Sequence, residues 1–331
     1  MARASLRMTI GALILSTLLF TGCASPSGPA EEPAGPSESA KPAAITIGTL
    51  ATQDSLPLWV AEDKGYYARA GLDDVEIVTF QSAQELQTAF VSGSVDALMT
   101  DIMVSANLQA SGTEVVLPTV MLGATIPEGR FAVVAAPDTE IASMADLKDV
   151  PVGTASLTIT EYVLDKLMEE AGVAESAVAK EEIDKMPVRF QLLMEGKLKA
   201  ASLPEPFVSL AELQGATVVP GGDDTKAQNN ISTTVLCVNR EYAQTGEGAA
   251  SVAALLEAWD AAVVDINADP DSFRQVLVDR ARLPEPLAKS YVVSTYPTAQ
   301  PPTAEMIQPV LDWMSAKGYL RSQVTPADLL P

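Results

Sequence analysis

From residue 44 onward the chain alternates short strand-like runs with helical segments. Residues 45–49 and 75–80 are strand-like, and the helical runs 57–70 and 83–92 follow them in turn. A regular exchange of strands and helices is typical of βαβ units and predicts a mostly parallel sheet. The last quarter is predicted to be helical, because apolar residues recur there at intervals of three and four. We therefore predict an α/β fold, and the length of 331 residues suggests two globular units.

The composition argues against several classes of function. The chain has 43 acidic and 21 basic residues, a net charge of −22, and no His. It lacks the basic balance that binding to nucleic-acid phosphates requires, so no nucleic-acid partner is expected. Without His, a Ser-His-Asp triad and an HExxH metal site are both excluded. Two Cys, Cys23 and Cys237, are too few for a Cys-rich metal site or a disulfide framework. We therefore predict neither a metal nor a cofactor.

The N-terminus has the pattern of a secretory signal peptide. Arg3 and Arg7 precede an uncharged apolar run over residues 8–20, which is too short to span a bilayer. The run leads into Phe-Thr-Gly-Cys, which resembles the bacterial lipobox and implies cleavage before Cys23 and lipidation of its sulfur. The alternative is an ordinary signal peptide followed by an unrelated Cys. Residues 24–43, rich in Ser, Pro, Ala, Gly and Glu, predict a flexible tether.

Several sequence motifs resemble those of one family. Residues 58–67 (LWVAEDKGYY), 70–72 (AGL) and 91–97 (VSGSVDA) match two signatures of the solute-binding proteins of the nitrate/sulfonate/taurine branch of ABC importers. Residues 193–201 and 204–206 repeat the second signature more weakly. The resemblance covers nearly all of the chain from residue 44. It is informative about fold and role, and it leaves the ligand open.

The resemblance implies a two-lobed periplasmic-binding-protein type II fold. Each lobe would be a mostly parallel sheet flanked by helices, and two crossover segments would join the lobes. The predicted parts are a signal peptide (1–22), a lipidated Cys with its linker (23–43), lobe 1 (44–126 plus 239–331), and lobe 2 (127–238) with crossovers near 127–133 and 234–239.

The family's role is implied in the same way. A protein of this kind captures a small polar solute outside the membrane and delivers it to an ABC permease with its ATPase. We expect a non-catalytic monomer, lipid-anchored to the bacterial cell membrane. Sulfonates, nitrate, taurine and pyrimidine-like compounds are the solutes that the resemblance suggests.

The candidate ligand residues follow from the predicted sheets. Ligands of open α/β sheets bind at the carboxyl ends of strands, so contacts are expected from the loops there. Helices beginning in these loops present backbone N–H groups that suit an anion. Arg130 is a further candidate, because it lies in a predicted crossover and its guanidinium suits a carboxylate, sulfonate or phosphate. The predicted ligand-binding residues are Thr52, Gln53, Asp54, Ser55, Gln81, Ser82, Thr100, Asp101, Arg130, Ser156, Thr158, Thr160, Glu161 and Glu205.

Several of these residues have a second interpretation. Ser55, Ser156 and Thr158 have the side chains of ordinary helix caps. Arg130 could instead form a structural ion pair with a cleft acid such as Asp54, Asp101 or Glu205. Glu205 itself could belong to a turn without a ligand role. Phe207 is an aromatic candidate for stacking on a ring, whereas Trp59 lies in an apolar helical run and is predicted to be core.

Two other functions remain as alternatives. Thiamine-pyrimidine synthases share the fold family, but the resemblance implies that they use a His and a Cys-rich segment, which this chain lacks. A membrane-anchored ligand sensor without a transport role is the other alternative. The charge of the solute is open as well: Arg130 and the helix N-termini favour an anion, whereas Asp54, Asp101 and Glu205 favour an amphoteric or neutral polar heterocycle.

Overall fold

The computed structural model describes residues 40–331. The predicted signal peptide, Cys23 and all but the last residues of the predicted linker lie outside the described residues. Within residues 40–331, no helix has both the length and the apolar character needed to cross a membrane.

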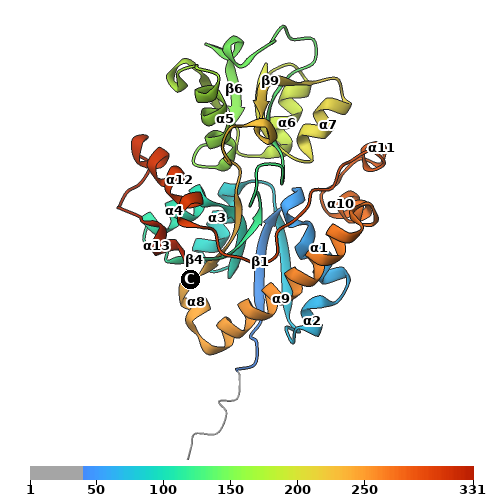
Figure 1. Ribbon diagram of the computed structural model, residues 1–331, viewed down its shortest axis with the longest axis vertical. Coiled ribbons are helices and arrows are strands. Elements are labelled where there is room, and N and C mark those ends of the chain that lie inside the picture. The colour runs from blue at the N-terminus through green and yellow to red at the C-terminus, as the bar shows by residue number, and fades with distance from the viewer. Residues whose placement is uncertain (1–39) are drawn as a thin grey trace, which may run out of the picture. The chain divides into compact units, whose positions relative to one another are not determined.

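Two five-stranded sheets form the framework (Figure 1). In spatial order the first sheet consists of β2 (Val75–Phe80), β1 (Ile45–Leu50), β3 (Ala97–Asp101), β10 (Thr234–Asn239) and β4 (Val115–Leu122). The second consists of β7 (Ala179–Glu182), β6 (Pro151–Thr154), β8 (Ala200–Pro204), β5 (Phe131–Ala135) and β9 (Thr217–Asp223). We call the part of the chain around the first sheet lobe 1 and the part around the second sheet lobe 2.

The two sheets share one pattern of strand directions. β1 pairs in parallel with β2 and β3, and β6 pairs in parallel with β7 and β8. β10 is antiparallel to both of its neighbours in the first sheet, and β5 is antiparallel to both of its neighbours in the second. One strand in five is therefore reversed in each sheet, and the predicted mostly parallel, two-lobed α/β fold is confirmed.

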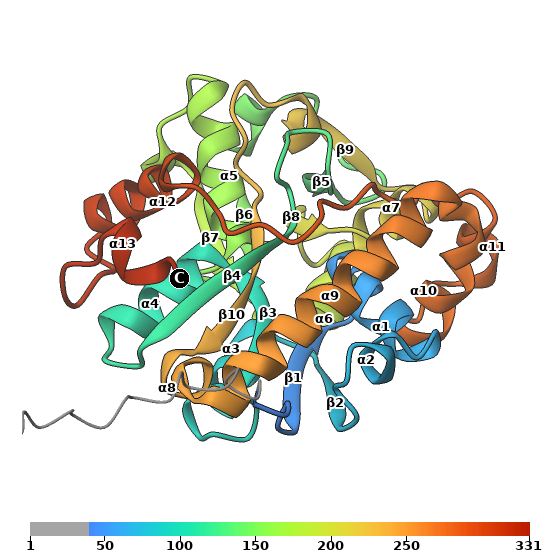
Figure 2. The ribbon, with the colours of Figure 1, turned by 60° about the horizontal axis from the view of Figure 1, so that its bottom comes forward.

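Helices cover both faces of each sheet (Figures 1 and 2). One face of the first sheet packs against α1 (Leu56–Asp63), α2 (Tyr66–Arg69), α9 (Gly246–Ala268) and α10 (Arg274–Arg280). Its other face packs against α3 (Ala83–Val91), α4 (Ile102–Ala110), α12 (Ala304–Ala316) and α13 (Pro326–Leu329). In lobe 2, α5 (Ile159–Glu170) covers one face, and α6 (Met186–Met194) and α7 (Phe207–Leu213) cover the other. Two short helices, α8 (Arg240–Gln244) and α11 (Glu285–Ala288), complete lobe 1.

Helix α12 connects lobe 1 to lobe 2. Its apolar side packs into the hydrophobic cluster that includes α4, and the same cluster continues to α5 of lobe 2. Trp313 of α12 packs edge-to-face on Tyr162 with 5.1 Å between ring centroids, and its Nε1 donates to Asp165 Oδ2 at 3.1 Å. The lobes are thus joined by packed side chains as well as by the chain itself.

The structure differs from the sequence prediction in two segments. The predicted helix over 57–70 is divided into α1 and α2, because Gly65 adopts a left-handed conformation with φ of +66°. Residues 234–239 were predicted as a crossover, but they form β10, which is hydrogen-bonded to β3 and β4 of lobe 1. The second crossover therefore precedes residue 234. An extended apolar run has the same sequence pattern whether it links two sheets or lies inside one.

The two crossovers run close together at Gly123, which follows β4. Gly123 has φ of +78°, and a Cβ atom there would clash with the backbone carbonyl oxygen of Ser232 on the second crossover. Only glycine therefore fits this position without a backbone shift.

We expect Gly123→Ala to lower the free energy of unfolding by about 3 kcal/mol, because backbone strain and the clash act together. Gly65→Ala is the matched control, since Gly65 also has a positive φ but no neighbouring atom in the space of a Cβ. Its cost should be about 1 kcal/mol. Urea unfolding measures both, and equal losses for the two variants would contradict the close approach at Gly123.

Candidate functional site

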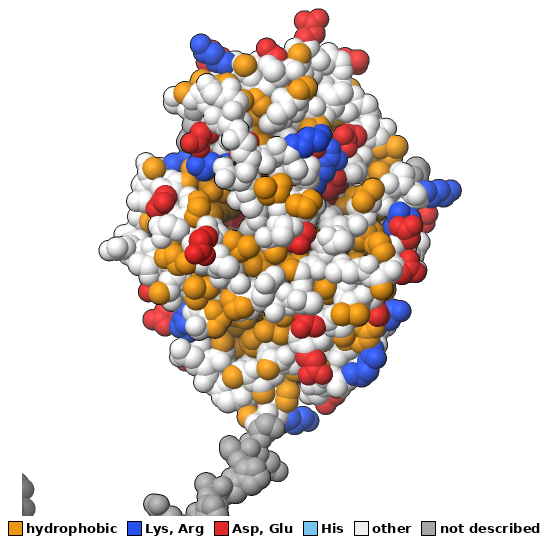
Figure 3. All heavy atoms as spheres, viewed as in Figure 1, with side chains coloured by type: hydrophobic (Ala, Val, Ile, Leu, Met, Phe, Trp, Pro, Cys, Tyr) orange, Lys and Arg blue, Asp and Glu red, His pale blue; other side chains and the backbone are white. Residues whose placement is uncertain are grey.

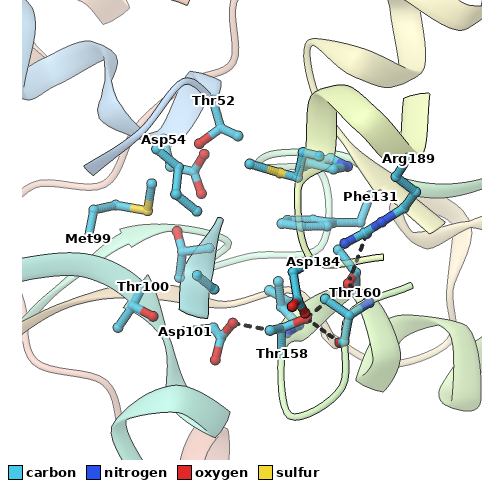
Figure 4. Close-up of a pocket in the computed structure, with 17 residues that line it drawn as sticks. Thr52, Asp54, Met99, Thr100, Asp101, Phe131, Thr158, Thr160, Asp184 and Arg189 are labelled. Carbon is cyan, nitrogen blue, oxygen red and sulfur yellow. Dashed lines mark hydrogen bonds between the residues drawn. The ribbon is translucent and has the colours of Figure 1, made fainter. Parts of the chain in front are cut away.

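A small cavity lies between the lobes (Figure 4). Its volume is about 50 Å³. The loops after β1 and β3 supply one wall, and β5, the start of α5 and α6 supply the other. Its polar lining residues are Thr52, Asp54, Thr100, Asp101, Thr158, Thr160, Asp184, Arg189 and Thr234.

Asp54 is a buried carboxylate on the lobe 1 wall. It is 4% exposed and follows β1 in a short 3₁₀ turn. In the described part of the chain no Lys or Arg lies within ion-pairing distance of it. Burial raises the pKa of Asp54 above its usual value. A hydrogen-bond donor or a cationic group entering the cavity would stabilise its charged form.

Asp101, at the end of β3, connects the two lobes. Its Oδ1 accepts from the backbone N of Val104 at 2.7 Å, which caps α4 in lobe 1. Its Oδ2 accepts from the backbone N of Ile159 at 2.9 Å, at the start of α5 in lobe 2. Burial raises the pKa of Asp101 to about 6 despite these hydrogen bonds. The first N–H of α5 is therefore already engaged by a carboxylate of the protein.

Arg189 brings a buried cation to the lobe 2 wall. It lies in the middle of α6 and is 1% exposed. Its Nε donates to Ile183 O at 3.0 Å, and its Nη1 donates to Ser202 O at 2.9 Å and to Thr160 Oγ1 at 3.2 Å. Figure 4 shows the side chain extending from α6 toward Thr160. The guanidinium group is therefore held by two backbone carbonyl oxygens and one hydroxyl oxygen, all of which are uncharged.

The charge of Arg189 is not neutralised by an ion pair. Within residues 40–331 no carboxylate lies within ion-pairing distance of its guanidinium group, and its Nη2 makes no hydrogen bond. Burial lowers the pKa of Arg189 to about 10, while Glu182 and Asp184 act in the opposite direction from longer range. The side chain is therefore charged at neutral pH, and buried charges are ordinarily paired.

Thr160, the threonine that accepts from Arg189 Nη1, is hydrogen-bonded to two further threonine hydroxyls. Thr158 Oγ1 donates to Ala155 O at 2.7 Å and lies 2.9 Å from Thr160 Oγ1. Thr154 Oγ1 donates to Thr160 Oγ1 at 3.2 Å. Hydroxyl groups both donate and accept, so this cluster can adjust its hydrogen bonds to an incoming group.

The structure brings six of the predicted ligand residues together in this cavity. They are Thr52, Asp54, Thr100, Asp101, Thr158 and Thr160. In lobe 1, the neighbouring predicted residues lie outside its lining. Gln53 accepts from Tyr291 and Ser294, and Ser55 donates to Leu50 O at 2.9 Å. Ser82 is the N-cap of α3, and Gln81 lines a second cavity, about 290 Å³ in volume.

The predicted residues of lobe 2 outside the cavity have protein partners. The backbone N and hydroxyl of Ser156 both donate to Glu182. Glu161 is buried and forms an ion pair with Lys180 at 2.9 Å, and it also accepts from Tyr319.

Arg130 lies in a cluster of acids rather than in the cavity. Its Nη1 atom is 3.2 Å from Glu205 and 2.9 Å from Glu212, and its Nη2 is 3.2 Å from Asp223. Burial alone would lower the pKa of Arg130, but these carboxylates raise it above its usual value. The sequence analysis gave two interpretations of Arg130, and the structure contains one of them, the structural ion pair with Glu205. Glu205 also accepts from the backbone N and the hydroxyl of Ser209.

Arg189 is the main residue of the cavity that the sequence analysis missed. Phe131, Met99 and Met186 also line the cavity and were not predicted. A signal was available, because Arg189 is surrounded by apolar residues in 186–194, where a buried charge requires partners. The sequence pattern predicted ligand contacts from the loops after strands, whereas Arg189 lies inside a helix. Among the described residues, no group of three acidic or Cys side chains is placed to hold a metal ion.

The paired sheets and the two lobes define the fold of the periplasmic binding proteins. The chain belongs to the NMT1/THI5-like family, whose model matches residues 52–272. The resemblance to nitrate- and sulfonate-binding proteins that the sequence motifs indicated is thereby confirmed. No curated protein matches the sequence significantly.

Solved structures share the fold. The periplasmic aliphatic sulphonate-binding protein SsuA of Escherichia coli is 21% identical, with a TM-score of 0.70 over 86% of this chain and 95% of that one. The alkanesulfonate-binding protein SsuA of Xanthomonas axonopodis, bound to MOPS, is 19% identical, with a TM-score of 0.73 over 87% and 98%. The periplasmic nitrate-binding protein NrtA of Synechocystis is 15% identical, with a TM-score of 0.68 over 87% and 84%.

Proposed function

We propose that this protein is the solute receptor of an ABC importer and binds a small anionic solute between its two lobes. Arg189 carries this proposal: it is a buried guanidinium group, charged at neutral pH, that faces an inter-lobe cavity without a carboxylate partner. An anion that accepts from its Nη2 would supply the missing counter-charge. The threonine hydroxyls of the same wall would complete the hydrogen bonds.

The opposite wall restricts which anions fit. Asp54 and Asp101 face the cavity from lobe 1, so a ligand with negative charge over its whole surface is disfavoured there. The solute should turn its anionic group toward lobe 2 and a donor, a cationic group or an apolar part toward lobe 1. A neutral polar heterocycle is the second candidate, favoured by the two acids, and it would leave Arg189 unpaired.

Binding would be coupled to closure of the lobes. Contacts that cross the cleft include Ile159 N to Asp101, Gln53 N to Glu205 O at 3.4 Å, and an ion pair between Glu85 and Lys185 at 2.7 Å. These contacts must open to admit a solute and form again around it, as in hinge closure. The closed receptor would then deliver the solute to a permease with its ATPase.

The N-terminal sequence, which resembles a secretory signal peptide, supports a location outside the cytoplasmic membrane. In this proposal Cys23 is lipidated, residues 24–43 tether the folded part to the bacterial membrane, and the receptor acts as a monomer.

On the face shown in Figure 3, Lys and Arg side chains are scattered and many lie beside acids, which offers no broad basic surface to a nucleic acid. With no His in the chain, we propose a non-catalytic role. The alternative is a ligand sensor without a permease. Dependence of solute transport on the protein distinguishes the receptor from such a sensor.

Ligand-linked stabilisation tests the receptor function. A solute at one hundred times its Kd should stabilise the folded protein by about 2.7 kcal/mol and raise its melting temperature. The screen contains nitrate, alkanesulfonates, taurine, aromatic carboxylates and pyrimidines, with sodium chloride at matched ionic strength as the control. If no member of the screen raises the melting temperature above that control, the proposal is wrong.

A further inference from the structure

A cluster of buried charges lies where α5 of lobe 2 meets the end of α12 in lobe 1 (Figure 2). Two buried acids of α5, Glu161 and Asp165, belong to it. Lys180 of β7 lies 2.9 Å from Glu161 and 2.6 Å from Asp165. Lys317 lies 2.9 Å from Asp165 and 3.6 Å from Glu161, and it belongs to residues 313–319 of lobe 1, which we call the seam segment. Both acids therefore form ion pairs with a lysine of each lobe.

The seam segment also contributes two aromatic side chains. Trp313 packs edge-to-face on Tyr319 with 5.6 Å between ring centroids, and Lys317 Nζ lies 5.2 Å and 5.6 Å from these two centroids. The hydroxyl of Tyr319 donates to Glu161 Oε1 at 2.9 Å, and Trp313 Nε1 donates to Asp165. Each acid of α5 thus receives a hydrogen bond as well as an ion pair from lobe 1.

Glu161 connects this cluster to the wall of the cavity. Its second oxygen, Oε2, accepts from the backbone N of Leu157 at 2.9 Å. Leu157 has φ of +59°, a left-handed conformation that residues other than glycine keep only where the surrounding structure holds them in it. The turn 155–160 contains Leu157 and lines the cavity with Ala155, Thr158, Ile159 and Thr160. One carboxylate therefore contacts both the seam segment of lobe 1 and the turn that lines the cavity in lobe 2.

The carboxylate of Glu161 is charged in the folded protein. Burial alone would raise the pKa of Glu161, but Lys180 lowers it below its usual value. The hydrogen bonds from Leu157 and Tyr319 act in the same direction as Lys180. Hydrogen bonds to an ionised carboxylate are stronger than those between neutral groups, so Glu161 is well suited to hold the turn in place.

The turn bears directly on the proposed solute site. Thr160 Oγ1 accepts from Arg189 Nη1 at 3.2 Å, and the backbone N of Ile159 donates to Asp101 of lobe 1 at 2.9 Å. A shift of the turn would therefore alter the surroundings of the cation and a contact between the lobes at the same time. Glu161 itself lies outside the cavity lining, so its effect on the site is indirect.

We propose that Glu161 is a positioning residue of the solute site: it holds the turn 155–160 in the geometry that lines the cavity, and the seam segment of lobe 1 holds Glu161. The inference rests on the proposed function, because it takes this turn as part of the site for a solute. It adds a connection through which contact between the lobes, outside the cavity, sets the position of the threonines that face it.

Hydrogen–deuterium exchange measured by mass spectrometry tests this connection without any solute. Tyr319→Phe removes the hydroxyl that donates to Glu161 from 158 positions away in the chain. We expect the amides of residues 156–160 to exchange at least about fivefold faster in this variant, because the turn loses part of its support. The amides of β8, in the core of the same lobe, should exchange as they do in the unmodified protein.

Further variants separate positioning from a general loss of stability. Tyr242→Phe is the matched control: it removes a hydroxyl that donates to Ala44 O at 2.9 Å in lobe 1, and it should leave exchange in the turn unchanged. Glu161→Ala should speed exchange in the turn at least about tenfold. Glu161→Gln keeps one oxygen for the amide of Leu157, and its exchange should be at least about threefold slower than that of the Ala variant.

The outcomes decide between a positioning role and a structural one. Faster exchange confined to the turn in Tyr319→Phe, with partial rescue in Glu161→Gln, supports the proposal. Unchanged exchange of the turn in Tyr319→Phe would overturn it, and so would an equal rise in the turn and in β8. Tyr319→Phe decides the test even where Glu161→Ala does not fold. Because no solute is present, failure here leaves the receptor function standing, and a failed thermal screen leaves the exchange result unchanged.

Discussion

Replacing Arg189 with Gln should weaken binding of an anionic solute by at least a hundredfold. The guanidinium group is buried and charged, and it has no carboxylate partner, so a bound anion would be its counter-charge. Removing one partner of a buried, hydrogen-bonded charge pair costs about 2–5 kcal/mol of binding free energy, and a hundredfold corresponds to about 2.7 kcal/mol. Calorimetric titration with the solute that gives the largest thermal shift measures the effect.

Arg189 also has a structural role, which the experiment must separate from binding. Its hydrogen bonds to Ile183 O and Ser202 O would be lost in the Gln variant, so some loss of stability is expected. Arg189→Lys keeps the charge but loses the forked geometry of the guanidinium group. We expect it to recover part of the affinity, about tenfold above the Gln variant, which a purely structural role does not predict.

Arg130 is the matched control for this experiment. It is another arginine near the cleft, but its charge is already balanced by Glu205, Glu212 and Asp223. Arg130→Gln should therefore lower stability, because Glu205 and Glu212 lose their cation and Asp223 keeps only Lys226, and it should change affinity by less than about threefold. Loss of binding in Arg130→Gln with full binding in Arg189→Gln would reverse our assignment of the anion site.

The contrast between these arginines shows what the sequence alone could and could not predict. Arg130 was predicted either to contact ligand or to form a structural ion pair with a cleft acid, because a lone charge in a crossover needs a partner. Its partners are 75 to 93 positions away in the chain and come from the turn after β8, from α7 and from β9, so only the fold brings them within reach. The tertiary structure therefore determines whether such a side chain binds a ligand or forms an ion pair with an acidic residue.

The predicted residues that line the cavity share a simple origin. The strands β1 and β3 end at the cleft, so the positions directly after or at their ends, such as Asp54 and Asp101, face it by topology alone. The pattern of strands and helices fixes these ends, and it is visible in the sequence. Arg189 reaches the same cavity from the side of α6, and the face of a helix that meets a cleft depends on how the helix packs.

The same distinction applies to the fold. The alternation of strands and helices was sufficient to predict two α/β lobes, because the spacing of apolar residues within each segment indicates whether that segment is a strand or a helix. The position of β10 was not predictable, since its apolar run is compatible with a link or with a central strand. Its pairing with β3 and β4 is set by contacts with residues more than a hundred positions earlier in the chain.

Asp224 gives the largest expected effect on stability. It lies at the end of β9 where the second crossover begins and is 2% exposed. Its Oδ1 accepts from the backbone N of Phe131 at 2.9 Å, whereas its Oδ2 has no hydrogen-bond partner. Burial raises the pKa of Asp224 from 3.8 to about 7, although the contacts of its carboxylate with Ser232 and with the backbone N of Phe131 act against this. The ionised carboxylate is therefore poorly stabilised in the folded protein.

The direction of the pH effect follows from this shift. Between pH 3.8 and about 7 the folded protein holds a proton on Asp224 that the unfolded chain releases, so stability falls as the pH rises through this interval. Asp224→Asn keeps an oxygen for Phe131 N and removes the charge. We expect it to raise the free energy of unfolding by about 4 kcal/mol at pH 8, and by progressively less toward pH 4. Asp74→Asn, which removes an exposed carboxylate, is the control. Urea unfolding at several pH values measures the difference, and a gain that does not depend on pH would show that Asp224 is not the group that titrates.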